Sequence, residues 1–353
     1  MMPPSHAGRN ARRLALALLI GIEAFGPGAA PAAADAVEDF YKGRTLRIVI
    51  GYAAGGGYDL YGRVFAEHFG KYLPGHPTIV PQNMPGAGSF LAARYLHDVA
   101  PRDGTTFGCV SQTLPLDAAM KADNDLDVTS LPYLGRLVDN VDIGLGSPGA
   151  WFSTFADARA RQIIVGATGG SSAGYLVPAA LLAYSGAKFK IVSGYGGSND
   201  VLLAMERREV ELIGAVGLPG VMQRNLTWIT ERKAPVLYQT ALKRHAALPH
   251  VPTLEETGLD DKGRAVLRAI AASADIGRSI ITTPGVPAAR LAALRQAFEA
   301  MMADPQLAAT LQKRDIMLGP APGEALDQIT REVVRTPRPV LDSIQALMST
   351  GGK

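Results

Sequence analysis

The sequence predicts an α/β protein built from two lobes with a ligand cleft between them. Short apolar runs with β character alternate with stretches whose apolar residues recur at helical spacing, which is typical of α/β folds with parallel strands. Four glycine-rich turns follow such β-runs, two in each half of the chain. The 353 residues are also enough for two domains. Ligands of open α/β sheets bind outside the carboxyl ends of the strands, so the four turns together predict one shared cleft.

The first 34 residues predict an export signal. Three arginines precede an apolar stretch over residues 14–22, and a small-residue cleavage site follows at 32–34. The apolar stretch is shorter than the roughly 20 residues that a membrane-spanning helix needs, and no later segment is long and apolar enough either. We therefore expect a periplasmic protein whose signal peptide is cleaved near Ala34.

Ten apolar runs are predicted to form the strands. Helical patterns lie between most of them, and the tail from about residue 287 to 349 is predicted to be helical, with breaks at its prolines. The predicted strands are residues 45–50, 78–82, 106–111, 132–137, 141–146, 162–166, 188–192, 210–216, 234–238 and 277–282.

The most informative turn follows the first predicted strand. There the chain passes through Gly55, Gly56 and Gly57 into an amphipathic helix. Glycines lack Cβ atoms and so allow close approach of the backbone, and the first turn of the helix presents unpaired N–H groups at the positive end of its dipole. This junction therefore predicts a binding site for an anion such as a carboxylate or phosphate.

Two nucleotide motifs do not fit this turn. A dinucleotide-binding fingerprint that starts at Gly55 reaches Gly57 but meets Leu60 where its third glycine is required. A phosphate loop from Gly51 to Gly56 requires a lysine at position 57, where the chain has glycine. Nucleotide binding is excluded on these grounds, and an ordinary tight turn without a ligand stays open for this motif taken alone.

Three further turns resemble the first in position and composition. One spans Asn83–Ser89, a second spans Val165–Gly174, and a third spans Ser193–Ser198, each after a predicted strand. Their repetition strengthens the prediction of a cleft, because turns from both halves of the chain can present amides to one ligand.

A serine hydrolase is the alternative function. Gly170–Gly174 matches the G-x-S-x-G nucleophile elbow with Ser172 as nucleophile, and Asp200 with His245 or His250 follow in the right order. No HGGG-like oxyanion segment precedes Ser172, and the pentapeptide arises easily by chance in glycine-rich sequence. The simpler interpretation is that the serine hydroxyls cap the helix and face the ligand.

Charge and cysteine content exclude other classes. The chain has 35 Lys+Arg against 32 Asp+Glu, a net charge of +3, and the two signs are interleaved, so no nucleic-acid footprint is visible. Cys109 is the only cysteine, which excludes an internal disulfide and a multi-cysteine metal site, and its apolar setting predicts a buried thiol. We expect no metal and no cofactor.

From about residue 40 onward the sequence resembles the extracytoplasmic receptors of tripartite tricarboxylate transporters, also called Bug-type solute-binding proteins. The resemblance rests on an ordered set of motifs, each unspecific alone. They are Gly55–Asp59, Asn83–Ser89, Asp103–Phe107, Thr168–Ser172, Tyr195–Gly197 and Pro252–Gly258.

The resemblance implies a periplasmic binding protein of type II-like fold, with two α/β lobes that close on a small organic carboxylate. It implies a monomeric receptor that delivers this ligand to the membrane subunits of the transporter, with no catalysis. Lobe 1 is expected to combine residues 36–140 with 266–353, and lobe 2 to hold 141–265. A secreted sensor that uses the same cleft without a transporter remains a further alternative.

The resemblance also implies the ligand contacts. In the family the first glycine loop holds one carboxylate and the serine-rich loop grips the ligand from the other lobe. Asp59 is expected to order the loop and the helix start, since its charge repels a carboxylate. The expected site residues are Tyr52, Gly55, Gly56, Gly57, Tyr58 and Asp59 in the first wall, Ser111, Gln112 and Thr113 at the base, and Thr168, Ser171, Ser172, Tyr195 and Gly197 in the second wall.

Two departures from the family pattern limit the choice of ligand. Gly196 stands where the family commonly has Lys or Arg, which weakens the case for a highly charged ligand. The segment Ala215–Pro219 lacks the Asp often found there, so no residue for an ammonium group is evident. The sequence therefore predicts an organic carboxylate without specifying citrate.

Overall fold

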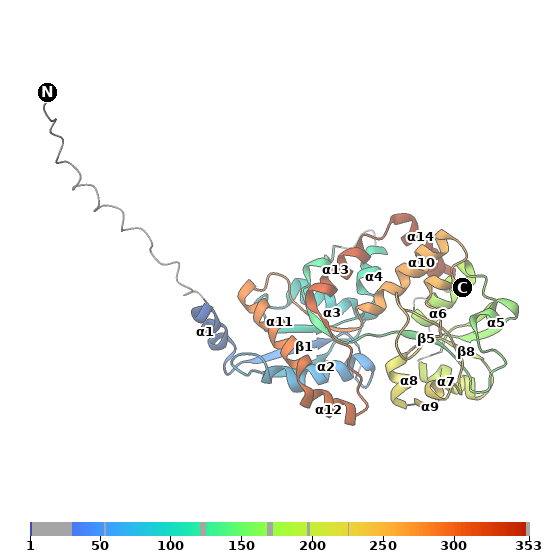
Figure 1. The fold of residues 1–353 in the computed structure, drawn as a ribbon, viewed down its shortest axis with the longest axis horizontal. Helices are drawn as coiled ribbons and strands as arrows, with labels where there is room; N and C mark the ends of the chain where they lie inside the picture. Colours follow the sequence, from blue (N-terminus) through green and yellow to red (C-terminus); the bar gives the residue numbers. More distant parts are fainter. Residues whose placement is uncertain are drawn as a thin grey trace.

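The computed structural model describes Met1 and residues 30–52, 54–120, 125–167, 172–195, 198–224 and 226–350. It shows two mixed β-sheets, each covered by helices and lying side by side along the molecule (Figure 1). Residues 2–29 of the expected signal lie outside the described residues, so this assignment stays a prediction. No helix within the described ranges has the length and apolar character needed to cross a membrane.

The first sheet is built around the N-terminal strands. Its order in the described chain is β11-β4-β10-β3-β1-β2, with β1 parallel to both β2 and β3. Strand β10 runs antiparallel to β3 and β4, and the short β11 pairs antiparallel with β4. The bounds are β1 Thr45–Ile50, β2 Thr78–Asn83, β3 Thr106–Cys109, β4 Tyr133–Val138, β10 Arg278–Thr282 and β11 Ala321–Pro322.

The second sheet has the order β7-β6-β8-β5-β9 in the described chain. Strand β6 is parallel to β7 and β8, whereas β5 runs antiparallel to β8 and β9. The bounds are β5 Asp142–Gly146, β6 Ile163–Gly166, β7 Phe189–Val192, β8 Leu212–Gly217 and β9 Val236–Gln239.

All ten predicted strands are present, but two of them run against their neighbours. Strands β5 and β10 each begin where the chain enters a sheet from the other one. The chain therefore arrives at the edge where the parallel strands end, and it can only continue antiparallel to them. Apolar patterning locates a strand without giving its direction, which explains the difference.

Helices cover both sheets. In the C-terminal region the breaks fall at prolines as expected: Pro305 opens one helix, Pro322 caps the next, and Pro337 directly precedes the last. The described α-helices are α1 Ala30–Tyr41, α2 Gly57–His68, α3 Phe90–Arg94, α4 Leu114–Met120, α5 Phe155–Ala160, α6 Ala173–Tyr184, α7 Ser198–Glu206, α8 Leu218–Arg224, α9 Leu226–Thr230, α10 Asp261–Ala271, α11 Ala288–Ala303, α12 Pro305–Lys313, α13 Gly323–Val334 and α14 Arg338–Thr350.

Aromatic packing between α2 and the first sheet anchors the site-bearing helix. Phe65 and Phe69 stack with centroids 4.4 Å apart, and both contact Phe107 of β3 edge to face. All three rings are fully buried, and each contributes roughly 1.5–3 kcal/mol from removal of apolar surface from water. Cys109 beside them is also fully buried, and burial raises the pKa of its thiol to about 12, as expected for an inert core residue. The carboxyl-terminal half of α2 is therefore held firmly on the sheet.

The chain crosses between the sheets twice, and the two crossings lie side by side. The first links β4 to β5, and the second leads through the short helix η6 Ala272–Asp275 into β10. The amide of Asn140 donates to the carbonyl of Ala274 at 3.3 Å, and Arg136 donates to the carbonyl of Asp275 at 2.6 Å. These paired crossings connect the two sheets, which is the usual position of a hinge in a two-lobed protein.

The exact lobe boundaries stay a prediction. Helix α10 packs against α6 and α14, and Val266 and Leu267 belong to the same buried cluster as residues of β6 and β8. The division into 36–140 with 266–353 and 141–265 is thus a proposal about which parts move together. Two segments assigned to lobe 1, residues 266–271 and helix α14, pack against helix α6 of the second sheet.

Candidate functional site

The glycine-rich turns emerge at two sheet edges that face each other across the crossings. At the first sheet, β1 and β3 end where β10 begins. At the second, β6, β7 and β8 end where β5 begins. The four turns follow β1, β2, β6 and β7, as the sequence predicts. Such a pair of carboxyl edges is the usual position of a ligand cleft in α/β proteins.

The turn after β1 is open on its outer side and packed on its inner side. Gly55 has a φ of +89°, which favours glycine, and a Cβ atom on Gly55 or Gly56 would meet nothing within 4 Å. A Cβ atom on Gly51 would instead overlap the side chain of Ser89. The second turn therefore supports the first, and the first turn of α2, from Gly57, leaves its N–H groups without helical partners.

Asp59 holds this turn in place. Its carboxylate accepts hydrogen bonds from the amide of Gly55 at 2.8 Å, from Nε of Arg63 at 2.9 Å and from Nδ2 of Asn83 at 2.8 Å. The bond from Arg63 is the largest influence that lowers the pKa of Asp59, which falls from 3.8 to about 2 although burial opposes the shift. The carboxylate is thus ionised and occupied, in keeping with a role in ordering the loop.

Two tyrosines form the floor beside the turn. Tyr52 and Tyr58 stack with centroids 4.2 Å apart and planes 12° from parallel. The hydroxyl of Tyr58 accepts a hydrogen bond from the amide of Gln112 at 2.9 Å, which ties the floor to the end of β3. Burial raises the pKa of both phenols, so both stay neutral.

Arg278, which the sequence patterns did not single out, points into this half of the site. It is the first residue of β10, and its guanidinium lies 3.8 Å from the centre of the Tyr58 ring. Nη1 donates to Oε1 of Gln112 at 3.0 Å, whereas Nε and Nη2 lie 3.6 and 3.7 Å from where a Cβ atom on Gly57 would stand. Within the described ranges no acceptor is bonded to Nε or Nη2. That edge of the guanidinium therefore faces the start of α2.

The signal for Arg278 in the sequence is faint. It is a single charged residue at the first position of an otherwise apolar strand. Its approach to Gly57 depends on β10 entering between β3 and β4, which the sequence alone does not reveal.

The three polar residues after β3 lie at the base of the site. The hydroxyls of Ser111 and Thr113 are 2.9 Å apart, and Thr113 donates to Asp117 at 2.8 Å. Nε2 of Gln112 donates to the carbonyl of Asn140 at 3.3 Å. Gln112 thus joins Arg278 to the first crossing between the sheets.

The second wall is described only in part. Thr168, Ser171 and Gly197 lie outside the described residues. Ser172 is the N-cap of α6 and accepts from the amide of Tyr175 at 3.3 Å, which agrees with the capping interpretation. The amide of Tyr195 donates to the carbonyl of Ala167 at 3.4 Å, so the turns after β6 and β7 contact each other.

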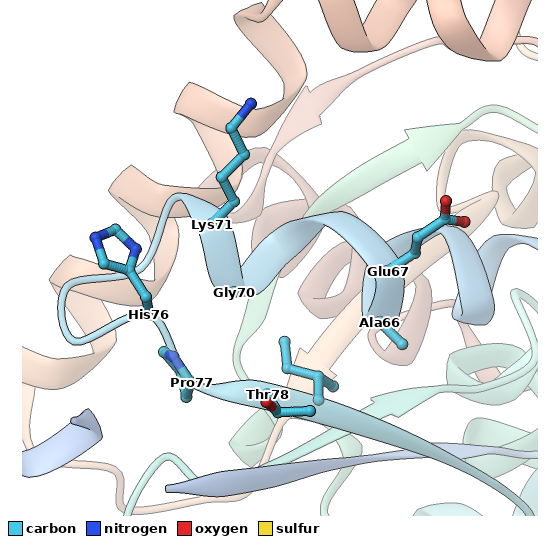
Figure 2. Close-up of a pocket in the computed structure, with 8 residues that line it drawn as sticks. Ala66, Glu67, Gly70, Lys71, His76, Pro77 and Thr78 are labelled. Carbon is cyan, nitrogen blue, oxygen red and sulfur yellow. The ribbon is translucent and has the colours of Figure 1, made fainter. Parts of the chain in front are cut away.

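A separate hollow lies on the outer side of the first sheet (Figure 2). Residues of α2, of the short helix η1 Phe69–Lys71 and of the segment entering β2 line it. Figure 2 shows Ala66 on the helix and Thr78 on the strand, with Lys71 extending away from the strand. This hollow is at the amino end of β2, opposite the edge that carries the turns, so it is not the expected cleft.

Two mixed sheets, two adjacent crossings and glycine-rich turns at facing edges define a two-lobed solute-binding protein of the periplasmic binding class. Residues 62–344 match the model of the tripartite tricarboxylate transporter family receptors. The chain belongs to this family, which confirms the resemblance seen in its motifs.

Individual relatives agree with this assignment. A UPF0065 protein in the gbd 5′ region of Cupriavidus necator is 30% identical over 242 residues, which are 67% of this chain and 70% of that protein. A TctC solute-binding protein from Polaromonas has a TM-score of 0.63 at 22% identity, covering 88% of this chain and 99% of its own.

Two solved structures of similar fold contain organic acids. An R. palustris protein with adipate has a TM-score of 0.61 at 17% identity and covers 87% of this chain and 98% of its own. MatC from Rhodopseudomonas palustris with bound malate has a TM-score of 0.59 at 18% identity, covering 86% of this chain and 99% of its own.

The family and its structural neighbours are solute-binding proteins rather than enzymes, which confirms the expectation of a non-catalytic chain. The hydrolase alternative is set aside on the same finding. In the structure, His245 accepts from the amide of Ala247 and lies 3.8 Å from Asp139 of the first crossing.

Proposed function

We propose that this receptor captures a small organic carboxylate in the periplasm and delivers it to the membrane subunits of a tripartite tricarboxylate transporter. The observation that carries the proposal is the position of Arg278: the Nε–Nη2 edge of its guanidinium faces the first turn of α2. A carboxylate between them would receive two parallel bonds from the guanidinium and further bonds from the open amides.

The energetics favour an anion at this point. Charge-assisted hydrogen bonds contribute about 1.5–3 kcal/mol each, and the positive end of the α2 dipole adds roughly 0.3–1 kcal/mol. The stacked tyrosines exclude water on one side and hold the guanidinium flat. The carboxylate that holds the turn, Asp59, has its oxygens taken by other donors, so it does not compete for Arg278.

The second lobe would complete the site on closure. In this proposal Thr168, Ser171, Ser172, Tyr195 and Gly197 contact the far side of the ligand, while Ser111 and Thr113 line its base. Contact with both lobes makes the closed form more favourable once ligand is bound, and closure offers the membrane subunits a surface that the open form lacks. The adipate and malate bound by structural relatives support a carboxylate as the ligand class.

A ligand screen with two substitutions tests the proposal. Titration calorimetry and melting-temperature shifts of the purified protein are measured with mono-, di- and tricarboxylates, because a ligand that binds only the folded state raises the melting temperature. Arg278→Gln should weaken the best ligand by roughly 10- to 100-fold, whereas Arg278→Lys, which keeps charge but loses the planar fork, should weaken it less.

Two results would contradict the proposal. One is a wild-type protein that no carboxylate stabilises. The other is a carboxylate that binds wild type and Arg278→Gln with equal affinity, since the ligand would then lie elsewhere. The melting temperature of each unliganded variant serves as the control for folding.

A further inference from the structure

Asp142 occupies the position in the second sheet that mirrors Arg278 in the first. It is the first residue of β5, opposite Gly217 at the end of β8, and so lies on the edge that faces the first lobe. Its backbone is fixed, because its amide donates to Oγ1 of Thr240 at 2.9 Å and its carbonyl accepts from the Thr240 amide at 2.8 Å. A carboxylate at this edge is unexpected in a cleft for anions.

One carboxylate oxygen of Asp142 is held and the other is not. Oδ1 accepts from Nδ2 of Asn140 at 3.2 Å. Oδ2 has no hydrogen-bond partner among the described residues, and the residue is only partly buried. Gly217 keeps the space beside it clear, since a Cβ atom there would stand 3.0 Å from Oδ1 of Asn140 and 3.7 Å from Oδ1 of Asp142.

Arg278 and Asp142 influence each other without forming an ion pair. Desolvation raises the pKa of the Asp142 carboxyl, and the charge of Arg278 is the largest effect that lowers it. In the described part of the chain no salt bridge joins Arg278 to Asp142. Three consecutive hydrogen bonds connect them instead. Arg278 donates to Gln112 at 3.0 Å, Gln112 to the carbonyl of Asn140 at 3.3 Å, and Asn140 to Asp142 at 3.2 Å.

This relay positions the two charges on opposite sides of the first crossing. The two opposite charges interact but are held apart, and each keeps a polar edge that no described residue bonds. On closure both edges would lose water, and an unsatisfied carboxylate oxygen in a closed cleft costs free energy unless a donor reaches it. A ligand with one acceptor end and one donor end satisfies both.

We propose that Asp142 is a specificity-determining residue that accepts a hydrogen bond from a hydroxyl or ammonium group of the ligand whose carboxylate binds Arg278. The ligand class is therefore a small carboxylate that carries a hydrogen-bond donor a few carbon atoms away. This inference rests on the proposed carboxylate site.

A purely structural role for Asp142 does not account for the geometry. Holding the Asn140 amide requires one oxygen, and Oδ1 provides it. Asp275, on the second crossing, makes a useful contrast, because desolvation also raises the pKa of its carboxyl but the main opposing charge is Arg136 rather than Arg278. Asp275 is therefore a matched acid whose main charge partner is Arg136.

The test compares ligands that differ only in the donor. Calorimetry measures the affinity of butanoate against its hydroxy and amino derivatives at carbons 2, 3 and 4, and of succinate against malate and aspartate. Wild type should bind the best donor-bearing member at least about 10-fold more tightly than the unsubstituted acid. Asp142→Asn should bring that ratio to within about 3-fold while leaving the unsubstituted acid little changed, and Asp275→Asn should preserve the wild-type ratio.

The same data separate the two donors. Asparagine keeps a carbonyl acceptor but loses the charge, so Asp142→Asn should weaken an ammonium ligand more than a hydroxyl ligand. Equal affinities within both series, no binding of any donor-bearing member, or an unchanged ratio in Asp142→Asn overturns the inference. If unsubstituted acids still bind wild type and bind Arg278→Gln more weakly, the proposed carboxylate site remains supported even though the role of Asp142 is wrong. Melting temperatures of the unliganded variants verify that each is folded.

Discussion

The two facing edges of the cleft differ in the kind of contact that their described residues make. In the first lobe, bonds from separate segments converge on the turn before α2, with Asp59 accepting from Gly55, Arg63 and Asn83 and Tyr58 accepting from Gln112. In the second lobe, the contacts described at the turns include the Ser172 cap and a backbone bond from the amide of Tyr195 to the carbonyl of Ala167. The side-chain bonds of the first lobe fix its turn before any ligand binds, so we expect a preformed half-site there, to which the second lobe adds contacts on closure.

Gly57→Val tests the first half-site with the largest expected effect. A Cβ atom at Gly57 already reaches ordinary contact distance from Nε and Nη2 of Arg278, and the branched valine fills the space that the carboxylate needs. Binding of the best carboxylate should fall by roughly 100-fold or more, because several charge-assisted bonds are lost together. Calorimetry measures the loss, and Gly57→Ala should lose less.

Gly323 provides a matched control for this substitution. It also opens a helix, α13, but a Cβ atom there would lie 2.1 Å from the carbonyl oxygen of Tyr133. Gly323→Ala should therefore lower the melting temperature without changing ligand selectivity. If Gly57→Val binds carboxylates with wild-type affinity, the half-site is not at the start of α2.

Asp59→Asn tests whether the first edge is preformed. Removing the charge should cost about 2 kcal/mol of unfolding free energy, the order that corresponds to a pKa lowered from 3.8 to about 2. Because the folded pKa is depressed, this stabilisation is complete above about pH 4 and is lost as the pH falls through about 2. Denaturant unfolding of both proteins between pH 7 and pH 2 should show the difference shrinking toward acid.

The outer helix α5 supplies the control for Asp59. Asp157 also has a lowered pKa, owing first to the amides of Ser153 and Thr154, but it lies away from the cleft edge. Asp157→Asn should leave carboxylate binding unchanged. Asp59→Asn should weaken it, and equal binding by both variants would show that the turn keeps its shape without Asp59.

Tyr58→Phe should have a smaller effect on the same lobe. It removes the acceptor for the Gln112 amide but keeps the ring beneath Arg278. We expect about 1–2 kcal/mol less stability from the unsatisfied amide and a few-fold weaker binding, because Gln112 also positions Arg278. Unfolding and calorimetry together measure this. A variant with full stability and affinity would mean that the bond contributes nothing.

Ser172→Ala tests the second edge and should have the smallest effect. Loss of the N-cap should cost roughly 1 kcal/mol, and the loss of affinity should be only a few-fold if the second lobe contributes chiefly by closing. An effect on binding as large as that of Gly57→Val would reverse the comparison and assign the anchor to the second lobe.

Much of this architecture follows from local sequence. The apolar runs located all ten predicted strands, with ends within two residues of those observed, because alternating patterns and glycine or proline boundaries are local properties. The turn residues Gly55, Gly56 and Gly57 were identifiable for the same reason. The pair Ala321–Pro322 escaped prediction, since a two-residue strand has no pattern of its own.

The sequence by itself determined the strands, the helix starts and the four turns, because these depend on backbone conformation and on nearest neighbours along the chain. Only the tertiary structure decided the directions of β5 and β10 and brought Arg278 against Tyr58 and Gly57, residues more than two hundred positions away. It likewise joined Arg278 to Asp142 through Gln112 and Asn140. The physical reason is that charged groups interact according to their distance in space. That distance depends on how the chain crosses between the sheets, and local sequence patterns do not reveal it.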